Sequence, residues 1–191
     1  MNPGSNAAPD ARIAPAAHRI LWILAWILFA AGMLGWLVLG ANRPDDPQIV
    51  GVSHDAPRVA VPGFGTVAFS VAGDAATYCA LEAASDAARA QGMQRRSDLA
   101  GYDAMVFRFE ADTTTSFINH FVPIDLSIGF YDASGRLVDT EEMAACPSGS
   151  GCPDYSAGAP FRTAIETAAG GLAQLGLAAP GAQVTLGGAC V

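Results

Sequence analysis

The chain has 191 residues, of which 51% are hydrophobic and 15% are charged, and its formal net charge is −8. This length allows one ordinary domain with accessory segments. The high apolar content excludes a fully disordered chain. The excess of acidic over basic residues argues against a nucleic-acid-binding protein, so no nucleic-acid partner is expected.

An apolar segment at residues 20–41 predicts a transmembrane helix. It carries no charge, and at about 1.5 Å per residue it spans about 33 Å, which is enough for a bilayer core of about 30 Å. The run is longer than the apolar region of a cleaved signal peptide, which favours an uncleaved signal-anchor. Arg12 and Arg19 precede the segment, whereas Arg43 is followed by two aspartates. The positive-inside tendency therefore places the N-terminus in the cytoplasm.

A stripe of large side chains on this segment predicts a contact inside the membrane. At helical spacing, one face carries Trp22, Trp26, Phe29, Met33 and Trp36. Such a face would suit a partner helix or a bulky cofactor, and it would equally suit the lipid of the bilayer. We predict a membrane-protein partner and no cofactor.

Three further segments complete the predicted organisation. Residues 1–19 form a cytoplasmic tail rich in alanine and proline, and residues 42–57 form an extended, charged tether with several prolines. Residues 58–191 form one domain of ordinary size. We expect a single-pass protein of the cytoplasmic membrane whose domain lies in the periplasm or another extracytoplasmic space.

Within this domain, alternating apolar and polar residues predict β-strands. The predicted strands cover residues 67–71, 77–83, 105–109, 122–130, 136–141, 161–167 and 183–186. Ser85 can cap a short helix that ends near Gly92, and a second short helix is predicted at residues 168–175. The predicted fold class is α+β and mostly antiparallel β, a small barrel-like domain with two short helices, preceded by the transmembrane helix.

Several short motifs occur in a characteristic order between residues 69 and 186. They are Gly92-Met93 with Arg95, the strand Met105-Val-Phe-Arg-Phe109, Asn119 with Val122-Pro123-Ile124-Asp125, the Phe130, Asp132 and Gly135-Arg136 turn, the loop with Cys146-Pro147, Cys152-Pro153 and Tyr155, and Glu166 with Ala169-Gly170 followed by Leu175-Gly176. In this order they resemble the domain-of-unknown-function family one-ninety-two, whose members are secreted or membrane-anchored prokaryotic proteins. The resemblance implies a fold and an extracytoplasmic location, but no activity.

One departure from the family bears on function. The family's Lys-Asn-Thr element is Ile118-Asn119-His120 here, so the lysine and the threonine are absent. A ligand site that used those two side chains would be altered in this chain.

All four cysteines follow the apolar segment, which suits an oxidising compartment. Cys146 and Cys152 lie in one loop and are expected to form a disulfide, because the Cys-x-x-Cys spacing of redox enzymes is missing. A zinc site is not expected, since no histidine lies in that loop. Cys79 and Cys190 are then expected to pair with each other, although three connectivities remain open.

Asn119, His120, Asp125 and Tyr155 are candidate ligand-binding residues. A histidine beside a carboxylate can act as a general base, but no nucleophile motif and no metal-spaced histidine pair accompanies it. The competing interpretation is that Asn119 and Asp125 bond backbone amides at a turn and fix the strand register. We predict no catalytic residues and no metal ligands.

These observations favour a non-enzymatic, membrane-anchored extracytoplasmic module that binds or braces a partner, such as a larger membrane complex. The alternative is a small-ligand-binding module with a cleft near Asn119 and Asp125. A thiol-redox or hydrolytic enzyme is a third hypothesis, which requires an exposed reduced cysteine or an acid–base pair within hydrogen-bonding reach.

Overall fold

The structure, a computed structural model, describes residues 57–188 and 190. The predicted tail at 1–19, the transmembrane helix at 20–41 with its aromatic face, and almost all of the tether at 42–57 lie outside the described residues. Among the residues that are described, no helix reaches the length and hydropathy that a bilayer crossing requires.

A seven-stranded sheet forms the body of the domain. Its strands are β1 (Gly65–Val71), β2 (Tyr78–Ala83), β3 (Ala104–Thr113), β5 (Leu126–Tyr131), β6 (Leu137–Met143), β8 (Phe161–Ala168) and β9 (Val184–Leu186), in the spatial order β6-β5-β8-β3-β2-β1-β9. Among the strand pairs of this sheet, which lies wholly within the described residues, β2 with β3 is the one parallel pair. Two short strands, β4 (Phe117–Ile118) and β7 (Asp154–Tyr155), form a separate ribbon. The predicted mostly antiparallel β domain is confirmed.

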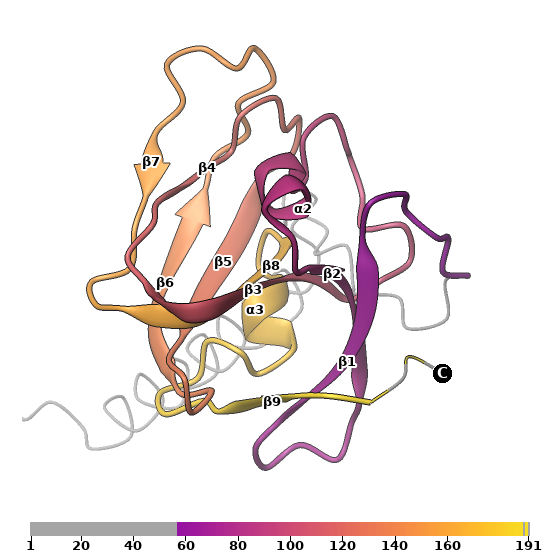
Figure 1. The fold of residues 1–191 in the computed structure, drawn as a ribbon, viewed down its shortest axis with the longest axis vertical. Helices are drawn as coiled ribbons and strands as arrows, with labels where there is room; N and C mark the ends of the chain where they lie inside the picture. The colour runs from indigo at the N-terminus through magenta and orange to yellow at the C-terminus, as the bar shows by residue number, and fades with distance from the viewer. Residues whose placement is uncertain (1–56, 189, 191) are drawn as a thin grey trace, which may run out of the picture. The chain divides into compact units, whose positions relative to one another are not determined.

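The sheet curls until its two ends meet (Figure 1). The turn between β5 and β6 reaches the segment that leads into β9, where Leu137 N donates to Ala182 O and Val184 N donates to Gly135 O, at 2.9 and 2.8 Å. Gly135 has a φ of +78°, and a Cβ there would lie 2.1 Å from Val184 O. Glycine at this position is therefore what allows the turn to approach β9 so closely.

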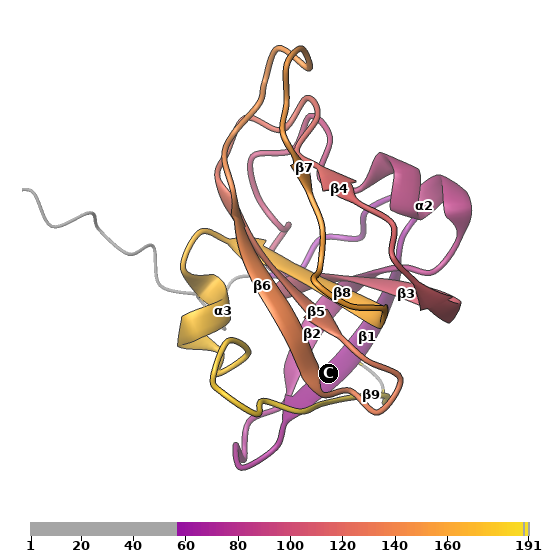
Figure 2. The same ribbon diagram turned by 90° about the vertical axis from the view of Figure 1, so that its left-hand side faces the viewer.

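Two short helices cover opposite sides of the sheet (Figure 2). Helix α2 (Asp86–Gln91) begins as predicted at Ser85, whose Oγ accepts a hydrogen bond from Ala88 N, and it ends at Gly92. Helix α3 (Gly171–Gln174) is shorter than the predicted 168–175. The reason is that residue 168 still pairs with Leu126 as the end of β8.

The period-2 alternation of the strands divides the core between the two faces. Met105 and Phe107 of β3 belong to the cluster on the α2 side, whereas Val106 belongs to the cluster on the α3 side. Leu172 of α3 packs into the second cluster. The face under α2 is the one that matters for the candidate site.

Strand β5 begins at Leu126, four residues later than predicted. Pro123 has no N–H to give to a strand ladder. Phe121 has a φ of +59°, which is outside the extended region. The stretch between β4 and β5 is therefore a loop, although its apolar residues alternate as they would in a strand.

Candidate functional site

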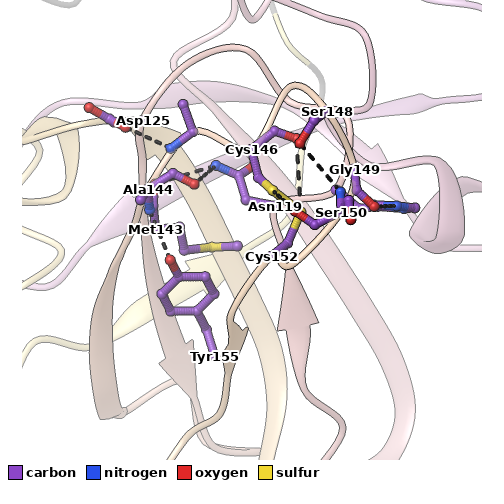
Figure 3. Close-up of a disulfide and its surroundings, with 12 residues drawn as sticks. Asn119, Asp125, Met143, Ala144, Cys146, Ser148, Gly149, Ser150, Cys152 and Tyr155 are labelled. Atoms are coloured by element: carbon purple, nitrogen blue, oxygen red, sulfur yellow. Dashed lines mark hydrogen bonds between the residues drawn. A yellow bond between two sulfur atoms is a disulfide. The ribbon is translucent and has the colours of Figure 1, made fainter.

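The predicted disulfide between Cys146 and Cys152 is confirmed (Figure 3). It closes a short ring in the loop that connects β6 to β7. The loop is tied to the β4–β5 connection at its start, where His120 and Cys146 form an isolated β-bridge and Cys146 N donates to Val122 O at 2.9 Å.

Asn119 joins the two loops from the inside. Its side chain is 1% exposed, and its Nδ2 lies within hydrogen-bonding distance of the carbonyl oxygens of Ile124, Met143 and Ala144, at 3.1, 3.3 and 2.9 Å. Nδ2 carries only two hydrogens, which are shared among these three acceptors. The amide thereby fixes the β4–β5 connection to the end of β6.

Asp125 and Tyr155 bond to consecutive backbone amides of the same loop. Asp125 Oδ1 accepts from Ala145 N at 2.7 Å, and the Tyr155 hydroxyl accepts from Ala144 N at 2.9 Å. In Figure 3 the Tyr155 ring rises toward this stretch of backbone from the strand below it. Both side chains act as local braces.

His120 is held on the other side of the loop. Its ring packs against Phe121, with 4.2 Å between the ring centroids. Its Nε2 bonds the carbonyl oxygen of Gly149, and because a carbonyl only accepts, Nε2 must carry the proton. Gly149 has a φ of +65°, and a Cβ there would lie 2.7 Å from this nitrogen. The contact therefore requires glycine at residue 149.

The four predicted ligand-binding residues thus lie close together, and each is bonded to the backbone around the disulfide. None of them lines either of the two cavities described below. Asp125 accepts from a backbone amide, as the competing interpretation expects, whereas Asn119 donates to backbone carbonyls instead.

A different region of the domain contains a cavity of about 480 Å³, a size typical of small-ligand sites. It lies between helix α2, strand β3 and the segment 113–118. Its lining includes Arg89, Phe107, Phe109, Phe117 and Glu166. A second cavity, of about 490 Å³, has no buried charged side chain in its lining. The first cavity, called the Glu166 cavity below, is the stronger candidate site.

Glu166 is the unusual member of this lining. It lies on β8 opposite Met105 of β3 and Ile128 of β5, is 4% exposed, and its Oε2 has no hydrogen-bond partner. Burial in these apolar surroundings penalises the carboxylate and raises the pKa of Glu166 to about 8. A buried carboxyl without a partner is costly, so the position calls for an explanation.

Arg89 forms one edge of the cavity, and its guanidinium is already bonded to other groups of the protein. Its guanidinium donates to the carbonyl oxygens of Ala84 and Arg108 at 2.5 and 2.7 Å, and it pairs with Asp86. It also lies over the Phe109 ring, 5.0 Å from the centroid. Arg89 therefore joins α2 to β3, and its charge is compensated by Asp86.

In the sequence, Glu166 stands out only as part of a family motif. The strand itself gives little signal, because Arg162 shares the two-residue phase of Glu166 and β8 shows no clear alternation. In the structure Ala164, which has the same phase, is fully buried, and Glu166 is buried with it. A carboxyl at such a position marks a candidate site.

Cys79 and Cys190, which were expected to be bonded, are free thiols in the structure. They are neighbours nonetheless. Cys79 pairs with Ala68 of β1, Ala68 O accepts from Gly187 N at 2.9 Å, and the chain end thereby reaches Cys79. Burial, and after it a hydrogen bond with Cys190, raises the pKa of the Cys79 thiol. A reactive thiol requires the opposite shift.

No group of three histidine, cysteine, aspartate or glutamate side chains that could hold a metal ion occurs in residues 57–188 and 190.

Comparison with known proteins supports the same fold. The family model DUF192, described as an uncharacterized ACR, matches residues 68–186. No curated protein matches the chain significantly. A protein of unknown function from Novosphingobium aromaticivorans has a similar structure, with a TM-score of 0.56 and 24% identity over 68% of this chain and 91% of that one. A proposed transcription regulator from Sinorhizobium meliloti gives 0.55 and 18%, over 66% and 98%. At these identities the likeness concerns the fold alone.

Proposed function

The chain belongs to the DUF192 family, and on that premise we propose that it is a membrane-anchored, extracytoplasmic accessory module, without enzymatic activity, that binds a small ligand in the Glu166 cavity. One observation carries the binding proposal: Glu166 is 4% exposed, one of its carboxyl oxygens has no hydrogen-bond partner, and the residue lines a cavity whose lining also contains phenylalanines. A bound ligand would supply the missing hydrogen bond.

The location of this site differs from the cleft that the sequence suggested. Asn119 Nδ2, Asp125 Oδ1 and the Tyr155 hydroxyl bond to backbone groups, and His120 Nε2 donates a hydrogen bond to Gly149 O. Asn119 Oδ1 is buried without a partner, but Asn119 lines neither cavity. These contacts give the disulfide loop a supporting role.

Two features support the extracytoplasmic part of the proposal. The apolar run at residues 20–41 is long enough to anchor the chain. The disulfide between Cys146 and Cys152 is of a kind that persists in oxidising compartments. An anchor in the membrane would bring the domain close to other membrane proteins. The stripe of large side chains from Trp22 to Trp36 is the surface that we propose contacts such a partner.

Reporter fusions at the C-terminus test the location. An alkaline phosphatase fusion should be active and a green fluorescent protein fusion dark, because the former needs an oxidising compartment and the latter fails to mature there after export. Deletion of residues 20–41 should reverse both results. A fluorescent fusion of the intact chain would contradict the proposed topology.

The binding part is tested by a small-molecule screen on the full-length chain, with the backbone amide signals of Gly92 and Phe117 as the readout. Both residues line the cavity. Compounds that shift these two signals, and leave those of the disulfide loop unchanged, would support the Glu166 cavity as the site. Shifts confined to the surroundings of Asn119 would contradict it.

A further inference from the structure

We infer that the Glu166 cavity recognises a small primary ammonium ion, whose N–H donates to the Glu166 carboxylate and whose carbon chain packs against the phenylalanines. This inference rests on the proposed function, since it names the ligand class of the same cavity. The N–H groups of such an ion distinguish it from quaternary ammonium ions, which have none.

The need for a donor follows from the carboxyl group. Glu166 Oε2 is a buried acceptor without a partner in the protein. An ionised carboxylate only accepts hydrogen bonds, so it is satisfied by a ligand that donates. An ammonium group donates and also carries the opposite charge, and charge-assisted hydrogen bonds of this kind are the stronger class.

The aromatic lining favours a cation. The faces of the phenylalanine rings carry partial negative charge and attract cations within about 6 Å of the centroid. One wall of the cavity already shows this contact, because the Arg89 guanidinium lies 5.0 Å from the Phe109 centroid. The half-buried Phe117 ring and the buried Phe107 ring, 5.0 Å apart by centroid, extend the aromatic surface.

Glu166 is the charged residue of the cavity lining that has no oppositely charged partner within that lining. The charged residues of the lining besides Glu166 are Asp86 and Arg89 of α2, which pair with each other. The other parts of the lining carry no charge: strand β3 contributes phenylalanines and a threonine, and the segment 115–118 contributes no titratable group. The residues paired with Glu166 on β3 and β5 are the apolar Met105 and Ile128. An entering monocation would therefore neutralise the site.

The charge of the whole domain acts in the same direction. Residues 57–190 contain fourteen acidic residues and seven arginines. An acidic surface raises the local concentration of cations and speeds their association. The cavity volume of about 480 Å³ leaves room for an amine of several carbon atoms.

Ligand binding should depend on pH with a definite sign. The pKa of Glu166 is about 8, so most molecules carry the neutral carboxyl at pH 6. Only the ionised fraction pairs with a cation, and the apparent affinity scales with that fraction. Between pH 6 and pH 8 the affinity for an ammonium ion should rise about 50-fold. An uncharged ligand that accepts a hydrogen bond from the neutral carboxyl would show the reverse.

The experiment compares n-butylammonium with its uncharged analogue 1-butanol, on the full-length chain with ¹³C-labelled glutamate carboxyls and ¹⁵N-labelled backbone. The Glu166 carboxyl and the Gly92 amide report binding. Two variants accompany the wild type: Glu166→Gln, which removes the charge from the cavity, and Glu110→Gln, which makes the same chemical change at an exposed position of β3 outside its lining.

We expect n-butylammonium to bind at pH 8 at least tenfold more tightly than 1-butanol, and more tightly than tetramethylammonium, which has no N–H. Glu166→Gln should weaken its binding at least tenfold, whereas Glu110→Gln should change it less than twofold. If Glu166→Gln does not fold, the pH dependence of the wild type still decides the question.

Four results would overturn the inference. If 1-butanol binds as tightly as n-butylammonium, the site takes uncharged ligands and the proposed function stands. If affinity for the amine rises as pH falls, the amine does not pair with the ionised carboxylate, and the proposed function again stands. If tetramethylammonium binds as tightly as n-butylammonium, the N–H contact is absent. If neither the amine nor the alcohol shifts the Glu166 and Gly92 signals, both the inference and the proposed binding function fail.

Discussion

Replacement of Glu166 by glutamine should make the domain's stability respond to pH in a way that only a buried carboxyl can cause. The pKa of Glu166 rises from an ordinary 4.5 to about 8 in the folded protein, because burial disfavours the charged form. Between these two values the folded state holds one proton more than the unfolded state. The contribution of Glu166 to stability is therefore greatest below pH 4.5 and falls as pH rises toward 8, by about 1.4 kcal/mol per pH unit.

The size of the effect follows from these two pKa values. From pH 5 to pH 8 the wild type should lose about 3.5 kcal/mol through Glu166 alone. For a domain of this length, that loss corresponds to a melting temperature lower by roughly 12 °C. Glutamine keeps the size of the side chain but does not titrate, so the variant should lack this contribution.

Urea unfolding at pH 5, 6, 7 and 8 measures the effect as a difference between Glu166→Gln and wild type. All other titrating groups are common to both proteins and cancel in this difference. The difference should move by about 3.5 kcal/mol in favour of the variant as pH rises from 5 to 8. Glu110→Gln, which removes an exposed carboxyl, should give a flat line. A flat line for Glu166→Gln as well would refute the argument that this carboxyl is buried without a partner.

The disulfide loop and the free thiols give further predictions. Asn119→Ala should lower the free energy of unfolding by about 2–4 kcal/mol, because buried carbonyls lose their donor; a loss below about 0.5 kcal/mol in urea unfolding would contradict the bracing role. Replacing Cys146 and Cys152 together by serine should cost about 2 kcal/mol for this short ring, without loss of cavity binding, and loss of binding would show that the loop belongs to the site. Alkylation of the unfolded, unreduced chain should label two cysteines, Cys79 and Cys190, and mass spectrometry that finds none labelled would show that they are bonded.

Most of the strands could be predicted, because in a β-strand with one face in the core apolar and polar residues alternate along the sequence. Phe107 and Phe109 predicted β3, and the serine at residue 85 predicted the start of α2. The prediction failed where local geometry overrides alternation. Val122 and Ile124 alternate as in a strand, but Pro123 and the positive φ of Phe121 exclude them from the sheet.

The candidate site was harder to predict, since a polar residue in a sequence does not reveal what it is bonded to. The sequence places three polar residues close together, Asn119, His120 and Asp125, and this clustering predicted a site. In the structure they bond to backbone groups that lie about twenty or more residues away in the chain, such as those of Ala144 and Ala145. Glu166 is one of four polar or charged residues in β8, so the sequence of the strand does not single it out. Its importance depends on helix α2 leaving a cavity beside β8, and that is a property of the assembled fold.

The parallel pairing of β2 with β3 and the closure of the sheet at Gly135 are likewise properties of the whole chain. Both join segments that are separated by other elements. Neither strand periodicity nor turn motifs specify such partners, because these signals describe one segment at a time.

The central claim is that the Glu166 carboxylate takes its missing hydrogen-bond partner from a ligand. A crystal structure of the protein isolated intact from its native membrane tests this most directly, at a resolution that separates water from larger molecules. We predict connected density in the cavity beside the phenylalanine rings, with a nitrogen about 3 Å from a carboxylate oxygen of Glu166. Density for isolated water molecules bonded to this oxygen, or a protein donor in contact with it, would contradict the claim.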